Sequence, residues 1–209
     1  MDEAAAPRSR THATASDAIG VAARWLFEGR RIDMQGVASE LGITRMTLHR
    51  RSGGRERLIG EAMWSLAEQA WIRCVSAAEV DDDPSGHELY SVRVIRSYNA
   101  VLVSSRGVRQ LFDAEPDLAL RLLTDAAGPI EPRMVAVTSE VIARDEAHGC
   151  LSPIIDRMDL AYALVKLAEA FLFGDLVAGR PVDVEAANRV QTALLEAGRV
   201  ASRPDASSR

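Results

Sequence analysis

The chain has 209 residues, a net charge of −5 and 47% hydrophobic residues, which is enough to pack one large domain or two small ones. Its longest apolar stretch, residues 160–173, is interrupted by Lys166 and Glu169, so it falls short of the roughly 20 apolar residues that cross a membrane. The first residues lack the apolar run of a secretory signal, so we expect a cytoplasmic protein.

The whole chain is predicted to be helical. Apolar residues recur three or four positions apart nearly everywhere, and the alternating patterns typical of strands hardly appear. Breaks rich in glycine and proline divide the chain into short segments. We therefore predict an all-α protein with a disordered arm at 1–13, a head at 14–54, a larger helical domain at 55–201 and a disordered tail at 202–209.

A helix-turn-helix pattern lies in the head. Asp33 is placed to cap a helix that ends at Leu41. Gly42 then supplies the left-handed backbone that a sharp turn needs, and Thr44 is placed to cap a second helix, 44–51. The residues expected on the inner face of this pair are small or apolar: Val37, Ala38, Leu41, Ile43 and Leu48.

Charge is distributed unevenly around this pattern. Residues 1–57 contain ten arginines against seven acidic residues, a net charge of +3, whereas the remainder carries −8. Because phosphates dominate the affinity of proteins for nucleic acids, a basic segment on an acidic body favours DNA binding. The same small excess also arises on solvated helix faces, so charge alone does not identify a DNA-binding domain.

The segment 32–64 also matches a known family pattern. At the positions of that pattern the sequence has Ala38, Gly42, Ile43, Thr44, Thr47, Leu48, His49, Arg51, Ser52, Gly54, Arg55, Glu56 and Leu58. With these residues the segment resembles the DNA-binding domain of the TetR family of bacterial transcriptional regulators. The preceding helix resembles the family's first helix through Ala18, Ile19, Ala22, Ala23, Leu26 and Phe27, followed by Gly29. The close match covers about residues 14–64, and the rest agrees in length and helix count.

Two positions depart from the family pattern. His49 replaces the usual tyrosine and keeps the capacity to hydrogen-bond a phosphate. Ser52 replaces a phenylalanine that normally anchors the recognition helix, and losing a buried aromatic costs about 3 kcal/mol or more unless neighbours fill the space. Two compensations are open: Ser52 caps the next helix, or the space is filled by Trp25, Phe27 or Met63.

The resemblance implies that the second helix of the motif reads operator DNA. Arg45 is expected to donate a bidentate pair to guanine, and Thr47 to contact a thymine methyl group. Arg50 and Arg51 contact bases or phosphates, or one of them faces solvent. The expected phosphate contacts are Thr44, His49 and Arg55. The full set of expected DNA-binding residues is Thr44, Arg45, Met46, Thr47, His49, Arg50, Arg51 and Arg55.

A dimer of such heads implies a symmetric operator. Two recognition helices would lie about 34 Å apart, one turn of the double helix, and so favour a palindrome. The N-terminal arm, which contains Arg8 and Arg10, either lies along a minor groove or is disordered.

The resemblance further implies a ligand pocket in the larger domain. The predicted helix 89–105 has an apolar face that includes Asn99, whose amide needs a partner from a ligand, a neighbouring backbone or water. The candidate lining residues are Trp71, Ile95, Tyr98, Asn99, Leu102, Phe112, Leu122, Met134, Tyr162 and Phe171. An apolar pocket suits an acyl chain, a lactone or a similar lipophile. The long helix 55–80 joins this domain to the head, so we expect a ligand to move it and spread the two heads.

Three predicted helices supply apolar surface for a homodimer. They are 130–148, 154–179 and 183–200. The second has an apolar surface broader than a single stripe, which requires partners on two sides. Asp183, which follows Pro181, is placed to cap the third.

These features together predict a ligand-responsive regulator, a repressor that a small lipophilic inducer releases from its operator. The alternative is a helical protein-interaction module whose degenerate head no longer binds DNA, as the serine at position 52 permits. No enzyme, cofactor or metal site is predicted. The histidines at positions 12, 49, 87 and 148 lie apart without an HExxH motif, and Cys74 and Cys150 fit no disulfide or zinc spacing.

Overall fold

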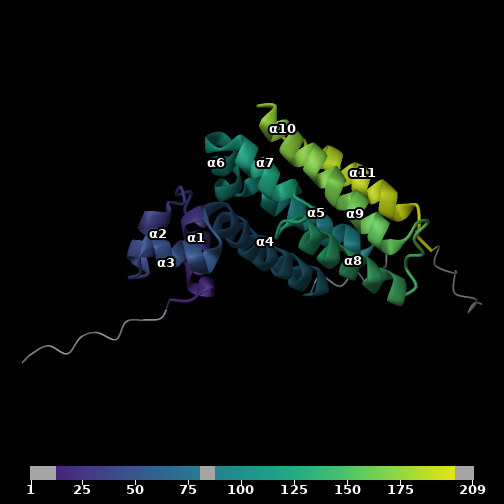
Figure 1. Ribbon diagram of the computed structural model, residues 1–209. Coiled ribbons are helices and arrows are strands. Elements are labelled where there is room, and N and C mark those ends of the chain that lie inside the picture. Colours follow the sequence, from purple (N-terminus) through teal and green to yellow (C-terminus); the bar gives the residue numbers. More distant parts are fainter. Residues whose placement is uncertain (1–12, 81–87, 201–209) are drawn as a thin grey trace, which may run out of the picture.

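The computed structural model describes residues 13–80 and 88–200. Figure 1 shows these residues as a small group of helices at one end of a longer helical body. The described residues form no strand, and their one isolated bridge joins Leu151 to Arg199. The prediction of an all-α fold is therefore confirmed. Arg8, Arg10 and the predicted tail lie outside the described residues, as does the predicted arm except for Ala13.

Three short helices form the head, residues 13–54. Their bounds are α1 Ala15–Phe27, α2 Met34–Glu40 and α3 Arg45–Ser52. Asp33 caps α2 by accepting from Gly36 N, and Thr44 caps α3 by accepting from Thr47 N, as predicted. Gly42 has a φ of +65°, which confirms the left-handed turn between the two helices.

The fourth helix connects the head to the rest of the molecule. α4 runs from Arg55 to Val80, the bounds that the sequence predicts. Its first half packs against α1, and Figure 1 shows it continuing beneath the other helices. We call α4 and everything after it the trunk.

The remaining helices of the trunk pack against each other and over one side of α4 (Figure 1). Their bounds are α5 Tyr90–Ser104, α6 Arg106–Ala114, α7 Pro116–Thr124, α8 Glu131–Ala147, α9 Arg157–Ala168, η1 Glu169–Phe173, α10 Gly174–Val177 and α11 Val184–Glu196. α9, the π-helical turn η1 and α10 follow one another without a break in the position of the predicted helix 154–179. Asp183 caps α11 by accepting from Ala186 N, as predicted.

A buried carboxylate fixes the start of α5 on α8. Asp145, only 4% exposed, accepts hydrogen bonds from Tyr90 N at 3.0 Å and from Ser91 N at 2.9 Å. These bonds satisfy backbone donors that a helix start leaves free, and a carboxylate is favoured there by the helix dipole. α5 and α8 are thereby held side by side, and both contribute walls to the cavity described below.

Candidate nucleic-acid interface and ligand cavity

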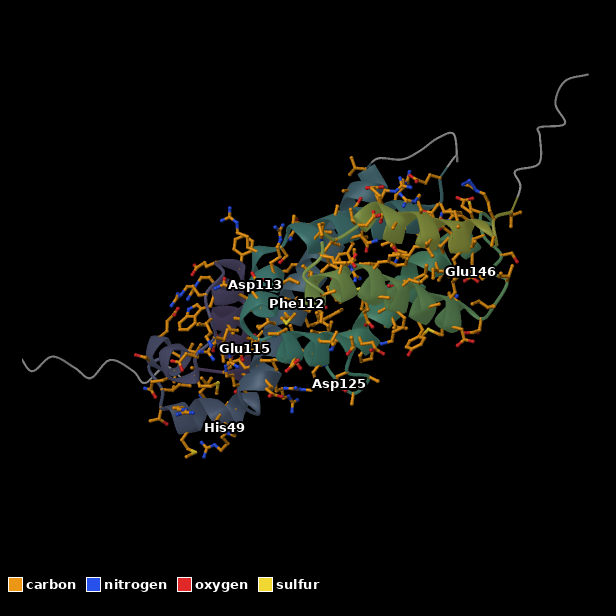
Figure 2. The ribbon with its side chains drawn as sticks, turned by 90° about the horizontal axis from the view of Figure 1, so that it is seen from above. His49, Phe112, Asp113, Glu115, Asp125 and Glu146 are labelled. Atoms are coloured by element: carbon orange, nitrogen blue, oxygen red, sulfur yellow. The ribbon has the colours of Figure 1, made fainter. Side chains whose placement is uncertain are left out.

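One face of α3 points away from the rest of the protein. Leu48 is fully buried on its inner side, whereas Arg45, Met46, His49 and Arg50 are exposed, Met46 to 77%. Figure 2 shows His49 at the outer edge of the head. This spacing is that of one side of an α-helix, so the four side chains share one surface.

The two threonines of α3 are bound to each other. Thr44 Oγ1 accepts from Thr47 N at 3.2 Å and lies 2.9 Å from Thr47 Oγ1. Thr44 is exposed and Thr47 is half-buried. The Thr44 hydroxyl therefore completes the cap of α3, which orders the first turn of the helix.

Arg51 and Arg55 are engaged within the protein. Arg51 donates to the carbonyl of Ala13. Arg55 donates to both oxygens of Glu115, at 2.8 and 2.6 Å, and to Ile32 O at 2.9 Å. All three nitrogens of the Arg55 guanidinium thus have partners. The side chain predicted to contact a phosphate thus joins Ile32 of the head to Glu115 of the trunk, which Figure 2 labels between the two.

This link perturbs the acid–base equilibria of both groups. The hydrogen bonds from Arg55 lower the pKa of Glu115, and Arg31 Nε, 3.3 Å from the same carboxylate, lowers it further. The hydrogen bond to Glu115 raises the pKa of Arg55 in turn. Both side chains are less than a third exposed, so the charge-assisted pair is partly shielded from water.

The serine at position 52 neither caps α4 nor leaves a polar group unpaired. Its hydroxyl donates to Leu48 O at 3.0 Å within α3. α4 starts instead from Gly54, whose carbonyl accepts from Leu58 N. Phe27 is 74% exposed, so it does not fill the place of the family's aromatic side chain. The head accommodates Ser52 at the half-buried end of the helix instead.

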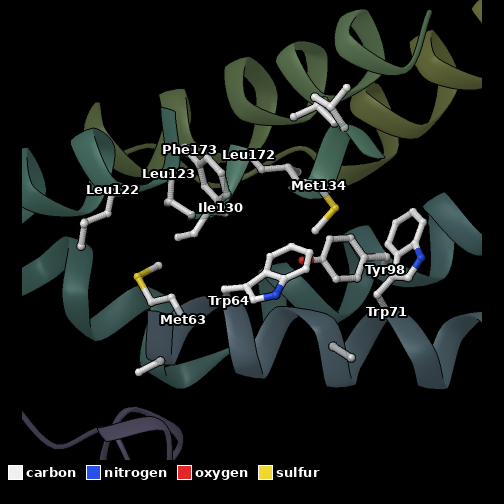
Figure 3. Close-up of a cluster of buried hydrophobic side chains, with 14 of the residues drawn as sticks. Met63, Trp64, Trp71, Tyr98, Leu122, Leu123, Ile130, Met134, Leu172 and Phe173 are labelled. Carbon is white, nitrogen blue, oxygen red and sulfur yellow. The ribbon is translucent and has the colours of Figure 1, made fainter. Parts of the chain in front are cut away.

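The trunk contains a largely apolar cavity of about 430 Å³. Its walls come from α4, α5, α8, α9 and η1, with the end of α1 and the start of α6 closing one side. Figure 3 shows part of this surface. Six of the ten residues predicted to line a pocket do so: Trp71, Ile95, Tyr98, Asn99, Leu102 and Met134.

The other four predicted residues do not line the cavity. Phe112 stacks on Phe173 with ring centroids 5.5 Å apart, and Phe173 takes the position at the wall. Leu122 is buried elsewhere, while the next residue along the chain borders the cavity. Tyr162 is 49% exposed on α9, and Phe171 is half-buried in η1. Helical spacing alone does not say which apolar residue of a turn faces a cavity and which faces a neighbouring helix.

Asn99 obtains its partners from α11. Its Nδ2 donates to Asn188 Oδ1 at 2.8 Å and to Gln191 Oε1 at 2.7 Å. Gln191 Nε2 in turn donates to Leu164 O at 2.8 Å. All three amides are at most 6% exposed. The need for a partner was predicted correctly, but the partner is a pair of side chains distant in sequence.

Two hydroxyl groups at the cavity wall are open to the cavity and have no partner among the described residues. Tyr98 and Thr138 are 5% and 3% exposed and line the cavity, and neither hydroxyl has a hydrogen-bond partner among the described residues. Burial raises the pKa of Tyr98, so the phenol keeps its proton. In Figure 3 its hydroxyl points away from Trp71, to the side on which Trp64 is labelled. Thr138 was not predicted, although it lies one turn beyond Met134 on α8.

The wall of the cavity also contains charged groups. Glu131 and Glu169 line it, and Lys166 donates to Oε2 of both, at 2.9 Å in the case of Glu169. Burial raises the pKa of Glu169, against the lowering effect of Lys166. One ammonium faces two carboxylates, so this group has a surplus of negative charge.

The cavity reaches the head. Leu26 and Phe27, the last residues of α1, form part of its wall together with Gly107 of α6. A Cβ on Gly107 would lie 2.4 Å from Leu26 O, which means that α6 and α1 touch at the level of the backbone. Glycine is needed there, because a larger residue would push the head away from the trunk.

Comparison with known proteins decides the family. The model for the domain described as "Tetracyclin repressor-like, C-terminal domain" matches residues 88–196, more than half of the chain. The chain belongs to the TetR family. No curated protein matches this TetR-family chain.

Two solved structures resemble this TetR-family member over most of its length. One is the transcriptional repressor QsdR of R. erythropolis, from the TetR family, at 25% identity and a TM-score of 0.76, with 90% of this chain and 97% of that chain covered. The other comes from Mesorhizobium loti MAFF303099 and is described as a TetR-family transcriptional regulator, at 19% identity and a TM-score of 0.53, with 88% and 93% covered. The second likeness supports the fold alone.

Proteins of the TetR family regulate transcription, bind operator DNA and small ligands, dimerise and are generally not enzymes. In the part of this TetR-family chain that the structure describes, no helix has the length and hydropathy needed to cross a bilayer. The same residues contain no group of three or more histidine, cysteine or acidic side chains placed to hold a metal ion.

Proposed function

We propose that this chain is a cytoplasmic, ligand-responsive transcription repressor that binds a palindromic operator as a homodimer and releases it when a small lipophilic molecule fills the trunk cavity. The observation that carries the proposal is the outward face of α3, with Arg45, Met46, His49 and Arg50 exposed above the buried Leu48. Neither Arg45 nor Arg50 is paired with an acidic side chain among the described residues. Their guanidinium groups are available for DNA.

Arg45 is the leading base-reading residue. It is the first residue of α3, and the N-terminal residues of a recognition helix are those that reach base edges in the major groove. A guanidinium at that place can donate two hydrogen bonds to guanine. Thr47 is the second candidate, through its methyl group, because its hydroxyl is bound to Thr44. Arg50 and His49 follow on the same face, near the phosphates.

A selection of binding sites from random duplexes tests this assignment. We expect the wild-type protein to enrich a palindrome, and both Arg45→Ala and Arg45→Lys to lose the preference at one position of each half-site, since lysine keeps the charge without the bidentate geometry. Arg180→Ala is the matched control, because Arg180 is 67% exposed and lies beyond α10, far along the chain from the head. Selectivity that survives in both Arg45 variants would contradict the assignment.

The same measurements test the alternative of a protein-interaction module. A head that binds DNA loses affinity steeply as salt rises, since it releases counterions from the phosphates. The expected result is a clear negative slope of affinity against salt for the wild-type protein and a shallower slope for Arg50→Ala, because Arg50 is placed near the phosphates. A protein that binds no duplex at low salt would favour the interaction module.

The proposed dimer interface uses α9 and α11. Met158 and Tyr162 are one helical turn apart on α9 and are 48% and 49% exposed, Ile154 in the segment before α9 is 66% exposed, and Val190 on α11 is 40% exposed. Exposed apolar side chains in one stripe mark a surface that a partner covers. α8, by contrast, exposes no large apolar side chain between Glu131 and Ala147, so we leave the predicted segment 130–148 out of the interface.

The proposed response to ligand depends on α4 and α6, which line the cavity and also contact the head. α4 lines the cavity through Met63, Ala67 and Trp71 and packs against α1 near its start. α6 touches the backbone of α1 at Gly107. A ligand that moves α4 and α6 therefore moves the head of each protomer and changes the spacing of the two α3 helices. A ligand can do so only to the extent that it binds one arrangement better than the other.

A further inference from the structure

We propose that the cavity selects a neutral amphipathic molecule, whose hydrogen-bond acceptor is held by the hydroxyl groups of Tyr98 and Thr138 and whose apolar body fills the rest, and that it rejects anionic acyl chains. The inference rests on the proposed function in that it takes the cavity as the ligand site, but it concerns binding only and is measured without DNA.

The first support is the pair of unpartnered hydroxyls. A tyrosine or threonine hydroxyl in a cavity wall is open to a hydrogen bond from a ligand when it has no protein partner. Tyr98 and Thr138 have none among the described residues, yet both face the same cavity from the adjacent helices α5 and α8. A carbonyl or ether oxygen of a ligand supplies the missing acceptor.

The second support is the size and chemistry of the rest of the wall. A space of about 430 Å³ accommodates a small organic molecule rather than a few waters. The surrounding groups are mainly aliphatic and aromatic, with Leu102, Met134 and Phe173 among them. Asn99 is bound to Asn188 and Gln191, and Gln191 also donates to Leu164 O of α9, so these amides add little competition for the ligand's polar group.

The charged groups argue against an anion. Glu131, which is 4% exposed, and Glu169 both border the cavity, and the single Lys166 is already shared between them. No cation is left at this end to pair with a carboxylate of the ligand. Arg73 and Arg106 also line the cavity, but both are exposed, so an ion pair with either stays in contact with water and adds little to affinity. An inserted carboxylate would face two like charges with no compensating partner.

The experiment compares three molecules with the same chain: methyl decanoate, decanoate and decylamine. Binding to the full-length protein is measured by titration calorimetry and by the change in tryptophan fluorescence, since Trp71 forms part of the wall. We expect methyl decanoate to bind at least about a hundredfold more tightly than decanoate, because an unpaired buried charge is costly. Equal or tighter binding of decanoate, or no binding of methyl decanoate, would overturn the proposal.

Conservative variants identify the groups responsible. Tyr98→Phe and Thr138→Val each remove one hydroxyl and keep the shape of the side chain. Each should weaken the binding of methyl decanoate by about three- to tenfold, the range of a neutral hydrogen bond. Tyr90→Phe is the matched control on the same helix, because Tyr90 is buried but does not line the cavity. Glu131→Gln combined with Glu169→Gln should raise the affinity for decanoate. Affinities unchanged in both hydroxyl variants, or a weaker decanoate affinity in the double variant, would refute the assignment.

The amine separates the effect of charge sign from that of polarity. Decylamine should bind less tightly than methyl decanoate, since an ammonium offers no acceptor to Tyr98, and tighter binding would make the cavity a cation site instead. Operator affinity is measured separately in the presence of methyl decanoate. If the ester binds as expected but operator affinity does not change, the proposed release mechanism fails while the ligand class stands.

Discussion

The head and the trunk are packed in opposite ways. In the head, Leu48 and Val37 are fully buried, and the ring of Trp25 lies so close to Gly36 that a Cβ there would meet it at 2.6 Å. In the trunk, longer helices leave about 430 Å³ between them. A closely packed core specifies one arrangement, whereas an unfilled one lets its helices respond to an occupant. The comparison therefore agrees with the proposal that the head recognises DNA and the trunk responds to a ligand.

The largest expected effect contrasts the same substitution in the two regions. Leu48→Ala in the head should lower the free energy of unfolding by about 3 to 5 kcal/mol, because the closely packed neighbours cannot collapse into the space. Leu102→Ala, at the half-buried cavity wall, should cost only about 1 to 2 kcal/mol, since it enlarges a space that already exists. Urea unfolding of both variants measures the difference.

Equal losses would mean that the cavity wall is as tightly packed as the head, and the contrast between the regions would fail. The slope of unfolding against urea should remain that of the wild type in both variants. A changed slope would point to partial unfolding of one region, and the two energies would then no longer be comparable.

The second prediction separates dimerisation from base reading. Met158→Glu places a charge in the exposed stripe of α9 and should convert the dimer to a monomer, with operator affinity at least about a hundredfold weaker because two heads no longer bind together. Light scattering and mobility shift measure the two effects. Ile72→Glu is the control, because Ile72 is 56% exposed on α4, outside the stripe. A dimeric Met158→Glu protein would contradict the proposed interface.

The sequence predicted the head more completely than the trunk. Local signals define the head: Asp33 and Thr44 cap helices within three residues of the cap, and Gly42 reverses the chain at a single position. These interactions are decided by short segments, so a pattern of residues is enough to recognise them. Arg55 was the exception, since its partner Glu115 lies 60 residues away.

The cavity depends on contacts that no short segment contains. Asn99 is held by α11, about 90 residues later, and Phe173 rather than Phe112 reaches the wall because the two rings stack. Helical periodicity identifies an apolar face but not which neighbour it meets. The pairing of Glu131 with Lys166 could not be predicted from helical periodicity either. Lys166 and Glu169, however, are one helical turn apart, so their pairing could have been predicted.

The third prediction tests the connection between the regions by pH. Because the pKa of Glu115 is lowered in the folded protein, its contribution to stability is complete above its ordinary value of 4.5 and is lost as the pH falls through the lowered pKa. Glu115→Gln should therefore destabilise the protein by about 1 to 2 kcal/mol at pH 7, and the difference from the wild type should shrink below about pH 4. Thermal unfolding between pH 3 and pH 7 measures it.

Asp117→Asn is the control for a change of charge alone, since this exposed residue lies in the same region of the trunk without an ion pair among the described residues. A difference between Glu115→Gln and the wild type that stays constant down to about pH 3 would show that the carboxylate of Glu115 is not the titrating group.

The smallest expected effect fills the cavity. Ala67 lines it from α4, and Ala67→Leu should raise the free energy of unfolding by about 0.5 to 2 kcal/mol, because the added carbons replace empty space. If the trunk is the responsive region, the same variant should bind methyl decanoate less well while its operator affinity in the absence of ligand stays within about twofold of the wild type. Ala77→Leu, at an exposed position of the same helix, is the control for adding a leucine outside the cavity. A stabilised variant whose operator affinity nevertheless falls would mean that filling the cavity alone moves α4, and the added side chain would then be acting as the ligand does.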